Sequence, residues 1–266
     1  MIIKNIIQET FDIKTFQLVF KDKAEGRDFK FLPGQFCEFS VFGAGEATFC
    51  LASSPTRPEF IECSIKKIGK VTSAIHELKE GDIAGLRGPY GNSFPLELIK
   101  EKNLLFIGGG IGLAPLRSLI DYCIDNRNNY KNMDIIYGAR TPQDLVYTRL
   151  YEEWKKQRNV NLHITVDRIV GDWAGNVDFV PAYLKELKPS AENAVAITCG
   201  PPIMIKFVVE ALAGLGFQDD RIISSLEMKM KCGAGKCGRC NIGKTYVCKD
   251  GPIFSYGEIK NMMKEF

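Results

Sequence analysis

The sequence Asn103-Leu-Leu-Phe-Ile-Gly-Gly-Gly-Ile-Gly-Leu-Ala-Pro115 decides the fold of this chain. Its first five residues, 103–107, form an apolar run with the length of a strand that is buried on both faces. Four glycines follow within residues 108–112, and an apolar helical pattern then extends from about 113 to 127. A buried strand, a glycine turn and a helix in this order are typical of the first unit of a nucleotide-binding α/β domain.

The glycine turn is the first candidate binding site. Backbone N–H groups at a helix N-terminus attract phosphate, so we predict that the turn binds the pyrophosphate of a dinucleotide. A tight strand-to-helix turn without a ligand is the alternative, because the spacing matches the Rossmann fingerprint only loosely. The position at the head of a series of strands and helices favours binding. The residues concerned are Gly108, Gly109, Gly110, Ile111 and Gly112.

Further strands are predicted downstream, at 133–137, 160–166 and 194–198, with helical patterns between and after them, for example over 202–215. Strands that alternate with helices indicate a parallel, doubly wound sheet. We therefore assign residues 99–226 to an α/β domain that binds NAD(H) or NADP(H).

Two other strand ends are candidates for the same site, because ligands of open α/β sheets bind beyond the carboxyl ends of the strands. The sequence Cys199-Gly200-Pro201 follows strand 194–198, so we expect it to face one crevice with the glycine turn. Arg140 follows strand 133–137 and is placed to contact the adenosine ribose or a 2′-phosphate. An exposed arginine lying on a loop is an equally good interpretation of Arg140.

Upstream, residues 1–98 contain short alternating strands separated by turns. The clearest are 13–20, 35–41 and 59–65, and such strands predict an antiparallel β-barrel. One helix, over 72–79, interrupts them, with Thr72 or Ser73 as its N-cap.

Near the C-terminus, Cys232, Cys237, Cys240 and Cys248 have the spacing C-x4-C-x2-C-x7-C. The first three match the plant-type spacing of a 2Fe–2S cluster, which takes four thiolates. Zinc sites usually have paired C-x2-C knuckles, and disulfides need an oxidising compartment, so both are weaker interpretations. Residues 227–266 are too short for an apolar core of their own, and we expect the cluster to hold this segment together.

The composition limits the class of protein. The chain has 266 residues, with 45% hydrophobic and 25% charged residues, as in ordinary globular proteins. The net charge of +3 is too small to indicate nucleic acid, and no apolar run is long enough for membrane insertion. Nine cysteines without a signal-peptide pattern indicate a reducing interior, and we expect a cytoplasmic protein.

These motifs together resemble a known group of proteins. Residues 30–226 resemble the ferredoxin–NADP reductase superfamily, through Phe31-Leu-Pro-Gly-Gln-Phe36, Gly88-Pro-Tyr-Gly91, the turn at 108–115 and Cys199-Gly-Pro201. The tail 232–256 resembles a narrower set, namely the electron-transfer subunits of dihydroorotate dehydrogenase, anaerobic sulfite reductase, sulfhydrogenase and heterodisulfide reductase systems. The resemblance implies a flavin-binding barrel, a nicotinamide-binding domain and a 2Fe–2S segment.

The resemblance also implies the flavin contacts. The family motif Arg-x-aromatic-Ser/Thr matches Ala47-Thr-Phe49-Cys50, so Phe49 would pack on the flavin and Cys50 would take the place of the hydroxyl near N5. Ala47 replaces the arginine that binds FAD phosphate, which leaves FMN as an alternative to FAD. The turn Gly69-Lys-Val-Thr72 matches the family's phosphate-binding turn. The implied flavin-binding residues are Phe49, Cys50, Leu51, Ala52, Ile65, Lys66, Gly69, Lys70, Val71 and Thr72.

The cofactors define a function. A nicotinamide gives up an electron pair, a 2Fe–2S cluster accepts single electrons, and a flavin converts between the two. We therefore expect an oxidoreductase subunit that passes electrons between NAD(P)H and a partner enzyme through FAD and a 2Fe–2S cluster. Cys50 and Cys199 are the expected catalytic residues, since Cys199 matches the family cysteine beside the nicotinamide. NADH is favoured because Arg140 stands alone.

A partner subunit is expected to dock near the cluster, where basic residues gather. An acidic partner surface would complement Lys229, Lys231, Lys236, Arg239, Lys244 and Lys249. Two other functions stay open: a self-sufficient NAD(P)H:ferredoxin-type reductase, and a nucleotide-binding interaction protein held together by zinc.

Overall fold

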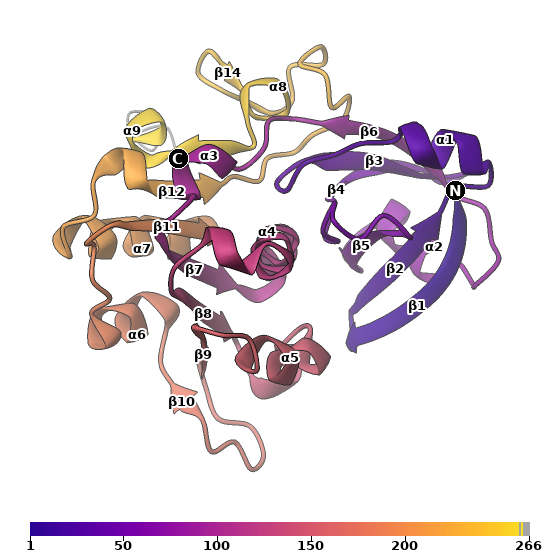
Figure 1. The fold of residues 1–266 in the computed structure, drawn as a ribbon. Coiled ribbons are helices and arrows are strands. Elements are labelled where there is room, and N and C mark those ends of the chain that lie inside the picture. Colours follow the sequence, from indigo (N-terminus) through magenta and orange to yellow (C-terminus); the bar gives the residue numbers. More distant parts are fainter. Residues whose placement is uncertain (261, 263–266) are drawn as a thin grey trace.

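The computed structural model of the chain describes residues 1–260 and 262. It has three parts: two antiparallel sheets from the N-terminal third, a sheet of seven strands, and a cysteine-rich segment that contacts both (Figure 1). No helix among these residues is long and apolar enough to cross a membrane.

The N-terminal part consists of two three-stranded antiparallel sheets, with the strand orders β1-β2-β5 and β4-β3-β6. Alternating apolar residues point inward from both sheets, and their core includes Phe16, Leu18, Phe39 and Ile75. The elements are β1 (Ile2–Thr10), β2 (Ile13–Val19), α1 (Lys23–Asp28), β3 (Phe36–Val41), β4 (Gly45–Cys50), β5 (Ile61–Lys66), α2 (Lys70–His76) and β6 (Gly85–Tyr90).

The predicted antiparallel architecture is confirmed, but the described strands do not close into a continuous barrel. The chain changes sheets at Leu51–Ala52, where the Leu51 N–H donates to Gln35 O (3.0 Å) and the Ala52 N–H donates to Glu62 O (2.8 Å). On the other side, a single bridge between Ile2 and Ile83 joins the sheets. The two sheets therefore meet at two seams around one shared core.

Helix α2 begins earlier than predicted. Gly69 is its N-cap, and Thr72 lies three residues inside the helix. The Thr72 hydroxyl accepts hydrogen bonds from the backbone N–H groups of Ile68 (2.9 Å) and Gly69 (2.8 Å), so from within the first turn it satisfies the two donors just before the helix. The prediction of Thr72 or Ser73 as N-cap was therefore wrong by three or four residues.

The seven-stranded sheet has the order β10-β9-β8-β7-β11-β12-β15. The chain runs from β7 outward through β8 and β9, then returns to β11 and β12 on the other side of β7, so the topological switch point lies between β7 and β11. All these pairs are parallel except β12–β15. The strands are β7 (Asn103–Gly109), β8 (Met133–Ala139), β9 (Val160–Val166), β10 (Asn176–Val177), β11 (Ala194–Cys199), β12 (Ile222–Ser225) and β15 (Ile253–Ser255).

Helices cover both faces of this sheet, which confirms the doubly wound fold. Helices α4 (Leu113–Asp125) and α5 (Tyr151–Lys155) lie on the face nearer the N-terminal sheets, and α6 (Val180–Leu187) and α7 (Pro202–Gly214) lie on the other (Figure 1). Each face has its own apolar core. The shorter helices are α3 (Leu96–Ile99), η1 (Gly110–Gly112), η2 (Arg127–Asn129), η3 (Pro142–Asp144), η4 (Thr148–Leu150) and η5 (Asp219–Arg221).

The cysteine-rich segment is held by more than its cysteines. Strand β15 pairs antiparallel with β12 and so joins the main sheet. Phe36 of β3 packs with Ile242, Val247 and Phe254 in a small apolar core. The expectation that the cluster alone holds the segment was therefore incomplete. Its other elements are β13 (Asn241–Ile242), β14 (Thr245–Tyr246), α8 (Val247–Asp250) and α9 (Tyr256–Ile259).

Asn92 fastens this segment to the link between the two larger parts. Its backbone N–H donates to Gly251 O (2.7 Å), its Nδ2 donates to Ile253 O (2.7 Å), and its Oδ1 accepts the Ile253 N–H (2.9 Å). A Cβ atom at the neighbouring Gly91 would lie 2.8 Å from Gly251 O, so the close approach requires glycine.

A buried arginine joins the α/β part to the N-terminal sheets. Arg117 of α4 forms an ion pair with Glu62 of β5, and a second with Asp121 at 3.4 Å. Its guanidinium also lies over the ring of Tyr147, 4.8 Å from the centroid. The Ser118 hydroxyl donates to Ser53 O at 2.7 Å beside it. These polar contacts fix the two parts in register, because each of these groups needs its partner once buried.

Candidate functional site

The two glycine turns that follow β7 and β11 lie in contact. A Cβ atom at Gly112 would be 2.6 Å from Cys199 O, and one at Gly109 would be 2.4 Å from Met204 Sδ. Glycine at both positions therefore allows the turns to pack together at the switch point, as the sequence predicted. On the outer side of the turn, no described atom lies within 4 Å of a Cβ built at Gly110. That open side leaves room for a ligand, and the binding itself stays a prediction.

Cys50 and Cys199 pack against the same apolar core, near a carboxylate that the sequence analysis missed. Burial raises the pKa of the Cys50 thiol, and the nearby Cys63, Cys199 and Glu227 raise it further. Burial, then Glu227, raises the pKa of Cys199 to about 12. Both thiols are therefore protonated near pH 7, and they act as neutral, weakly donating groups.

Glu227 follows β12, the last parallel strand, and it is exposed. No sequence motif marks Glu227 as a site residue, because only the fold brings it near Cys50 and Cys199. It is also the first residue of the predicted cluster segment. The predicted flavin strand, nicotinamide turn and cluster segment thus meet at one place.

The predicted flavin strand lies beside the predicted phosphate turn. Phe49 is half-buried and stands edge-on to Phe39, with ring centroids 6.3 Å apart. A Cβ atom at Gly45, where β4 begins, would be 3.5 Å from the Val71 side chain. Lys70 is exposed at the start of α2. The structure therefore brings both ends of the predicted flavin site together.

Other members of the predicted flavin set are less open. Leu51, Ala52 and Ile65 have no exposed surface, so they lie behind the site as the structure stands. Lys66 is exposed and pairs with Asp12 at 3.3 Å. The Thr72 hydroxyl also donates to Gly69 O (3.0 Å), so a phosphate would have to displace one of its three bonds.

Arg140 follows β8 and is exposed, as predicted, but it does not stand alone. The Arg168 N–H donates to Arg140 O at 3.2 Å, and the Asp167 carboxylate lies near both arginines. Burial raises the pKa of Asp167, and the two arginines oppose this shift. The isolation of Arg140 therefore no longer supports a choice of NADH.

The four clustered cysteines lie in a loop whose backbone N–H groups face sulfur. Ala234 and Lys236 donate to Cys232 Sγ (3.4 and 3.3 Å), and Gly235 donates to Cys248 Sγ (3.1 Å). The backbone N–H groups of Ala234, Cys237 and Lys236, that of Ala234 most, lower the pKa of Cys232 to about 6. Gly235 has a φ of +68°, a conformation that glycine adopts without strain. The loop therefore stabilises the thiolate of Cys232.

The sulfurs fall into two pairs, Cys232 with Cys237 and Cys240 with Cys248. Within residues 1–260 and 262, no group of three His, Cys, Asp or Glu side chains converges on a single metal position. A 2Fe–2S cluster takes two thiolates at each iron, so paired sulfurs fit it, whereas one tetrahedral zinc ion needs four ligands around one point. Burial and the neighbouring Cys240 raise the pKa of Cys248 to about 12.

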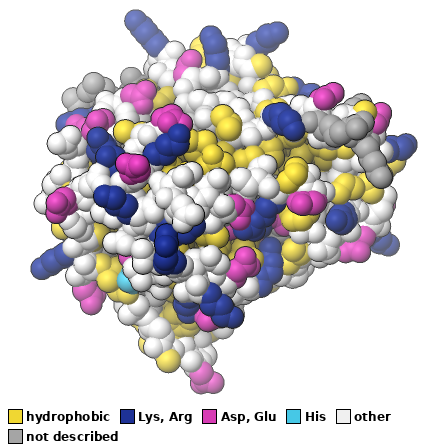
Figure 2. Space-filling model, in the orientation of Figure 1, with side chains coloured by type: hydrophobic (Ala, Val, Ile, Leu, Met, Phe, Trp, Pro, Cys, Tyr) yellow, Lys and Arg dark blue, Asp and Glu magenta, His cyan; other side chains and the backbone are white. Residues whose placement is uncertain are grey.

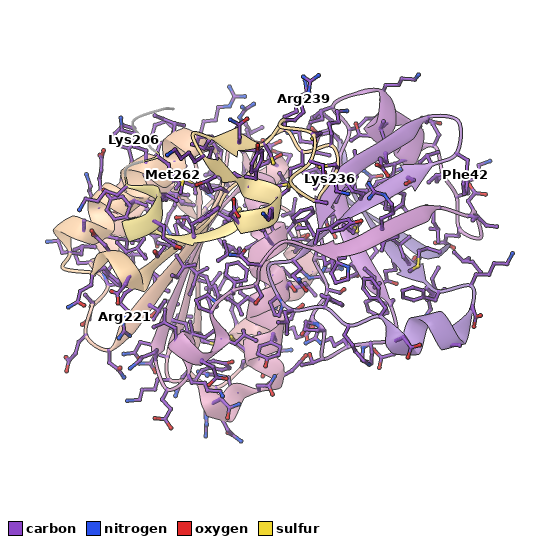
Figure 3. The ribbon with its side chains drawn as sticks, turned by 90° about the horizontal axis from the view of Figure 1, so that it is seen from above. Phe42, Lys206, Arg221, Lys236, Arg239 and Met262 are labelled. Carbon is purple, nitrogen blue, oxygen red and sulfur yellow. The ribbon has the colours of Figure 1, made fainter. Side chains whose placement is uncertain are left out.

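The outer cysteine pair lies at a basic surface. Cys237 is exposed, whereas Cys240 and Cys248 are buried. Lys236 and Arg239 project from the same loop (Figure 3). Lys and Arg side chains also project along the upper edge of the molecule in Figure 2, where Figure 1 places the cysteine-rich segment. All six basic residues named from the sequence are exposed.

Comparisons with known proteins agree with this geometry. Residues 106–210 match the family model described as "Oxidoreductase NAD-binding domain", and residues 227–260 match "Iron-sulfur cluster binding domain of dihydroorotate dehydrogenase B". The chain is similar to a solved structure titled "Insights into flavin-based electron bifurcation via the NADH-dependent reduced ferredoxin-NADP oxidoreductase structure". That likeness has a TM-score of 0.78 and 24% identity over 99% of this chain and 91% of the other, and it supports the fold.

Relatives of similar length are more informative. Sulfhydrogenase 1 subunit gamma of Pyrococcus furiosus is 40% identical over 253 residues, which are 92% of this chain and 86% of the relative. A probable dihydroorotate dehydrogenase B (NAD(+)) electron transfer subunit of Methanocaldococcus jannaschii is 35% identical over 266 residues, 99% of this chain and 91% of the relative. The chain therefore belongs to the family of the sulfhydrogenase gamma subunits and the electron-transfer subunits of dihydroorotate dehydrogenase B.

Proposed function

We propose that this chain is the electron-transfer subunit of a larger redox enzyme and passes electrons between NAD(P)H and a partner subunit through FAD and a 2Fe–2S cluster. One observation carries the proposal: Cys50 of the flavin strand packs against the same apolar core as Cys199 of the nicotinamide turn, and Glu227 at the head of the cysteine segment is near enough to raise the pKa of both thiols. Electron transfer among three cofactors needs this closeness. The relatives named above are subunits of multisubunit enzymes, which supports a partner.

When bound, FAD accepts the electron pair of a nicotinamide and releases single electrons to a cluster. The chain's own task is placement and exclusion of water. The turns at 108–112 and 199–201 would hold the nicotinamide dinucleotide, with Arg140 at the adenosine end. Phe49, Cys50 and the turn at 69–72 would contact the flavin, with 51–52 and 65–66 supporting that site from behind, and the paired cysteines would hold the cluster.

Cys50 and Cys199 would shape the hydride-transfer pocket as neutral thiols. Their raised pKa values mean that neither carries a charge beside the reacting rings near pH 7. Asp167 beside Arg140 supports NADH as the donor.

The partner would dock at the basic surface around Cys237, since an acidic surface would complement it. The dense set of cysteines, all nine of them free in this structure, supports a reducing location, and we place the protein in the cytoplasm. Purification of the tagged chain from its own host, followed by identification of the co-purifying subunit, tests for the partner. Recovery of the chain alone would instead favour the self-sufficient reductase.

The first experiment is an anaerobic optical titration of the purified chain with NADH and then NADPH, with iron, flavin and zinc determined on the same sample. We expect two iron atoms and one FAD for each chain, and bleaching of both flavin and cluster bands at lower concentrations of NADH than of NADPH. FMN in place of FAD would correct the flavin identity, because Ala47 does not supply the family's phosphate-binding arginine. Zinc without iron, or no bleaching by either nucleotide, would overturn the proposal.

A further inference from the structure

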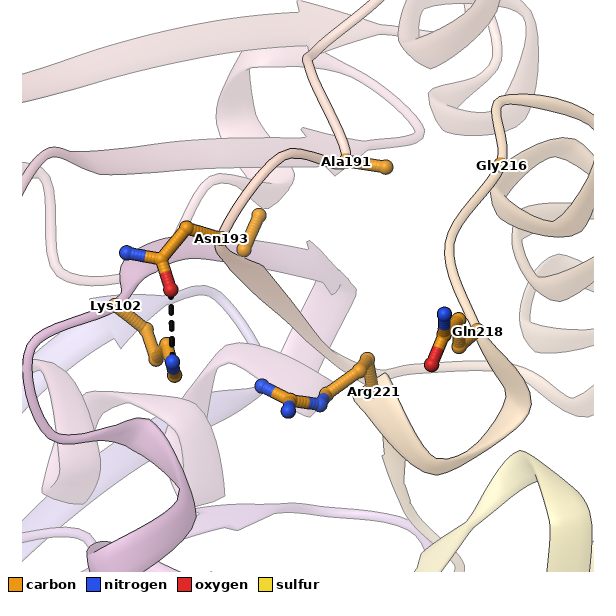
Figure 4. Close-up of a pocket in the computed structure, with 7 residues that line it drawn as sticks. Lys102, Ala191, Asn193, Gly216, Gln218 and Arg221 are labelled. Carbon is orange, nitrogen blue, oxygen red and sulfur yellow. Dashed lines mark hydrogen bonds between the residues drawn. The ribbon is translucent and has the colours of Figure 1, made fainter.

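A polar cavity of about 200 Å³ lies at the edge of the main sheet where its parallel strands begin. Lys102 immediately precedes β7, Asn193 precedes β11, and Arg221 precedes β12 (Figure 4). The two glycine turns lie at the opposite ends of β7 and β11, so this cavity is separate from the predicted nucleotide site. The full lining is Lys102, Ala191, Asn193, Ala194, Gly216, Gln218 and Arg221.

Two cations face each other in this cavity. Arg221 reaches toward the Lys102 ammonium, and Asn193 lies beside them (Figure 4). None of the seven described residues that line the cavity is acidic. Two like charges that point toward one another are unfavourable, and an anion between them would reverse the sign of the interaction.

Lys102 is held in place from the protein side. Its Nζ donates to Asn193 Oδ1 at 2.7 Å, and Asn193 Nδ2 donates to Glu101 O at 3.0 Å. Both ends of the Asn193 amide are therefore engaged, and the ammonium keeps two further N–H donors for a ligand. This preorganisation reduces the entropy that binding would cost.

Arg221 is not fully paired within residues 1–260 and 262. Its Nε is buried and has no hydrogen-bond acceptor there. The Oδ2 atom of Asp220 lies 3.9 Å from this Nε, which is beyond hydrogen-bond distance. The side chain as a whole is 32% exposed, so its guanidinium can turn toward a ligand in the cavity. A planar guanidinium with free N–H groups is well suited to bidentate contact with an oxyanion.

We propose that this cavity binds a small tetrahedral oxyanion, phosphate or sulfate, between Lys102 and Arg221. Its volume is several times that of a water molecule, about 30 Å³, and is below the range of about 300–1,000 Å³ that drug-sized ligands need. The carboxamide of Gln218 at the rim would add a neutral donor. The bound anion would join the first residues of β7, β11 and β12.

Isothermal titration of the purified holoprotein with phosphate, and separately with sulfate, tests the proposal. Sodium chloride keeps the ionic strength constant, since surface charge effects depend on it. We expect one site for each chain with millimolar affinity. Binding of phosphate and not sulfate would assign the site to a protonated oxyanion, whereas equal binding would assign it to tetrahedral dianions generally; either result supports the proposal.

Variants locate the site. Lys102→Gln and Arg221→Gln should each weaken binding about tenfold, the loss of one charge-assisted contact. Lys155→Gln and Arg158→Gln are the matched controls, because each removes an exposed cation that donates one side-chain hydrogen bond elsewhere on the α/β part. They should leave binding unchanged.

Two results would overturn the proposal. One is the absence of any heat or ³¹P line broadening with phosphate. The other is binding that falls equally in the control variants, which would mean attraction by the overall charge. Normal NADH-dependent dye reduction by Lys102→Gln and Arg221→Gln confirms that the variants are folded.

Discussion

At the residue scale, the pair Cys50 and Cys199 shows how a fold sets the chemistry of a side chain. A free thiol ionises near pH 8.5, but burial and the nearby Glu227 keep both of these protonated well above that value. A neutral thiol can donate a weak hydrogen bond to a bound ring without placing a charge beside it. We therefore expect the two cysteines to line the proposed hydride-transfer pocket as small polar side chains and not to act as nucleophiles.

This gives a pH prediction. The rate of flavin reduction by NADH should show no inflection from a thiol between about pH 7 and 10, because the pKa of Cys199 is raised and the protonated form persists through that range. Cys199→Ser should keep the rate within about threefold, since a hydroxyl is also neutral there. Stopped-flow absorbance at the flavin band is the measurement. An inflection near the ordinary thiol pKa that Cys199→Ser removes would contradict the assignment.

Arg117 carries a stability prediction at the same scale. Arg117→Met leaves the buried carboxylate of Glu62 without its cation and leaves Asp121 with Arg57 alone, at 3.6 Å, so it should lower the free energy of unfolding by about 3–5 kcal/mol. Urea denaturation followed by fluorescence measures this. The double variant Arg117→Met/Glu62→Leu should recover part of the loss, because one uncompensated charge is then removed.

The control for Arg117 is Lys155→Gln. Its ion pair with Glu152 is exposed, so its loss should change stability by no more than about 1 kcal/mol. Equal effects of the buried and exposed substitutions would show that the contact between the two parts does not depend on Arg117.

At the element scale, strands with a recognisable hydrophobic pattern were predictable from the sequence. Strands that form only because a neighbouring strand offers hydrogen bonds were not. The apolar runs of β7, β8, β9 and β11 appear in the structure with the predicted first residues, because burial on both faces demands such runs. Strand β15 has only three residues, and it exists because β12 offers an open edge. The change of sheet at Leu51–Ala52 is equally unpredictable from the sequence, because it depends on the carbonyl groups, of Gln35 and of Glu62, to which these two N–H groups donate.

The hydrogen bonds that Asn92 forms with Gly251 and Ile253, together called the Asn92 clamp, lead to a prediction about the cluster segment. Asn92→Ala removes the two side-chain hydrogen bonds to Ile253, so residues 250–253 should detach more often from the link after β6. We expect iron to be lost to a chelator several times faster, with flavin reduction by NADH unchanged. Iron release followed optically with a chromogenic chelator is the measurement.

Asn126→Ala is the matched control for Asn92, because Asn126 Nδ2 donates to Tyr122 O at the end of α4, outside the cysteine-rich segment. If both variants release iron at the rate of the unaltered chain, the clamp does not hold the segment. If Asn92→Ala also slows flavin reduction, the effect is not confined to the cluster.

At the scale of the whole molecule, the sequence predicted the three parts of the chain but not the place where they come together. The cysteine spacing, the glycine turns and the change of period together indicated three kinds of structure. Their convergence at Cys50, Cys199 and Glu227 required the fold, because these residues are far apart in the chain. The neighbourhood of Arg140 and Arg168 likewise arises from the alignment of the ends of β8 and β9, which no local pattern encodes.

The basic surface gives a prediction at this scale. Charge reversal at Lys236 and Arg239 should slow electron transfer to the partner about tenfold or more at low salt, with a smaller effect at high salt, because exposed charges steer encounter and are screened. Dye reduction by NADH should be unchanged. Parallel assays with the co-purified partner and with a small dye measure the two activities.

Lys185→Glu is the control for this surface, since Lys185 is exposed on α6, on the face of the main sheet away from the N-terminal sheets. It should leave both activities intact. Equal loss of transfer and dye reduction in the double reversal, or equal loss in the control, would count against docking at the cysteine loop.

The pairing of β15 with β12 has a consequence for how the chain matures. A sheet edge with free N–H and C=O groups invites pairing with other chains, and β12 would be such an edge without residues 253–255. Since this strand comes after all four cysteines, a nascent chain closes its sheet only once the whole metal-binding loop has been made. The β12 edge would then become protected from pairing with other chains at the same stage of synthesis at which the four cysteines become available to bind iron.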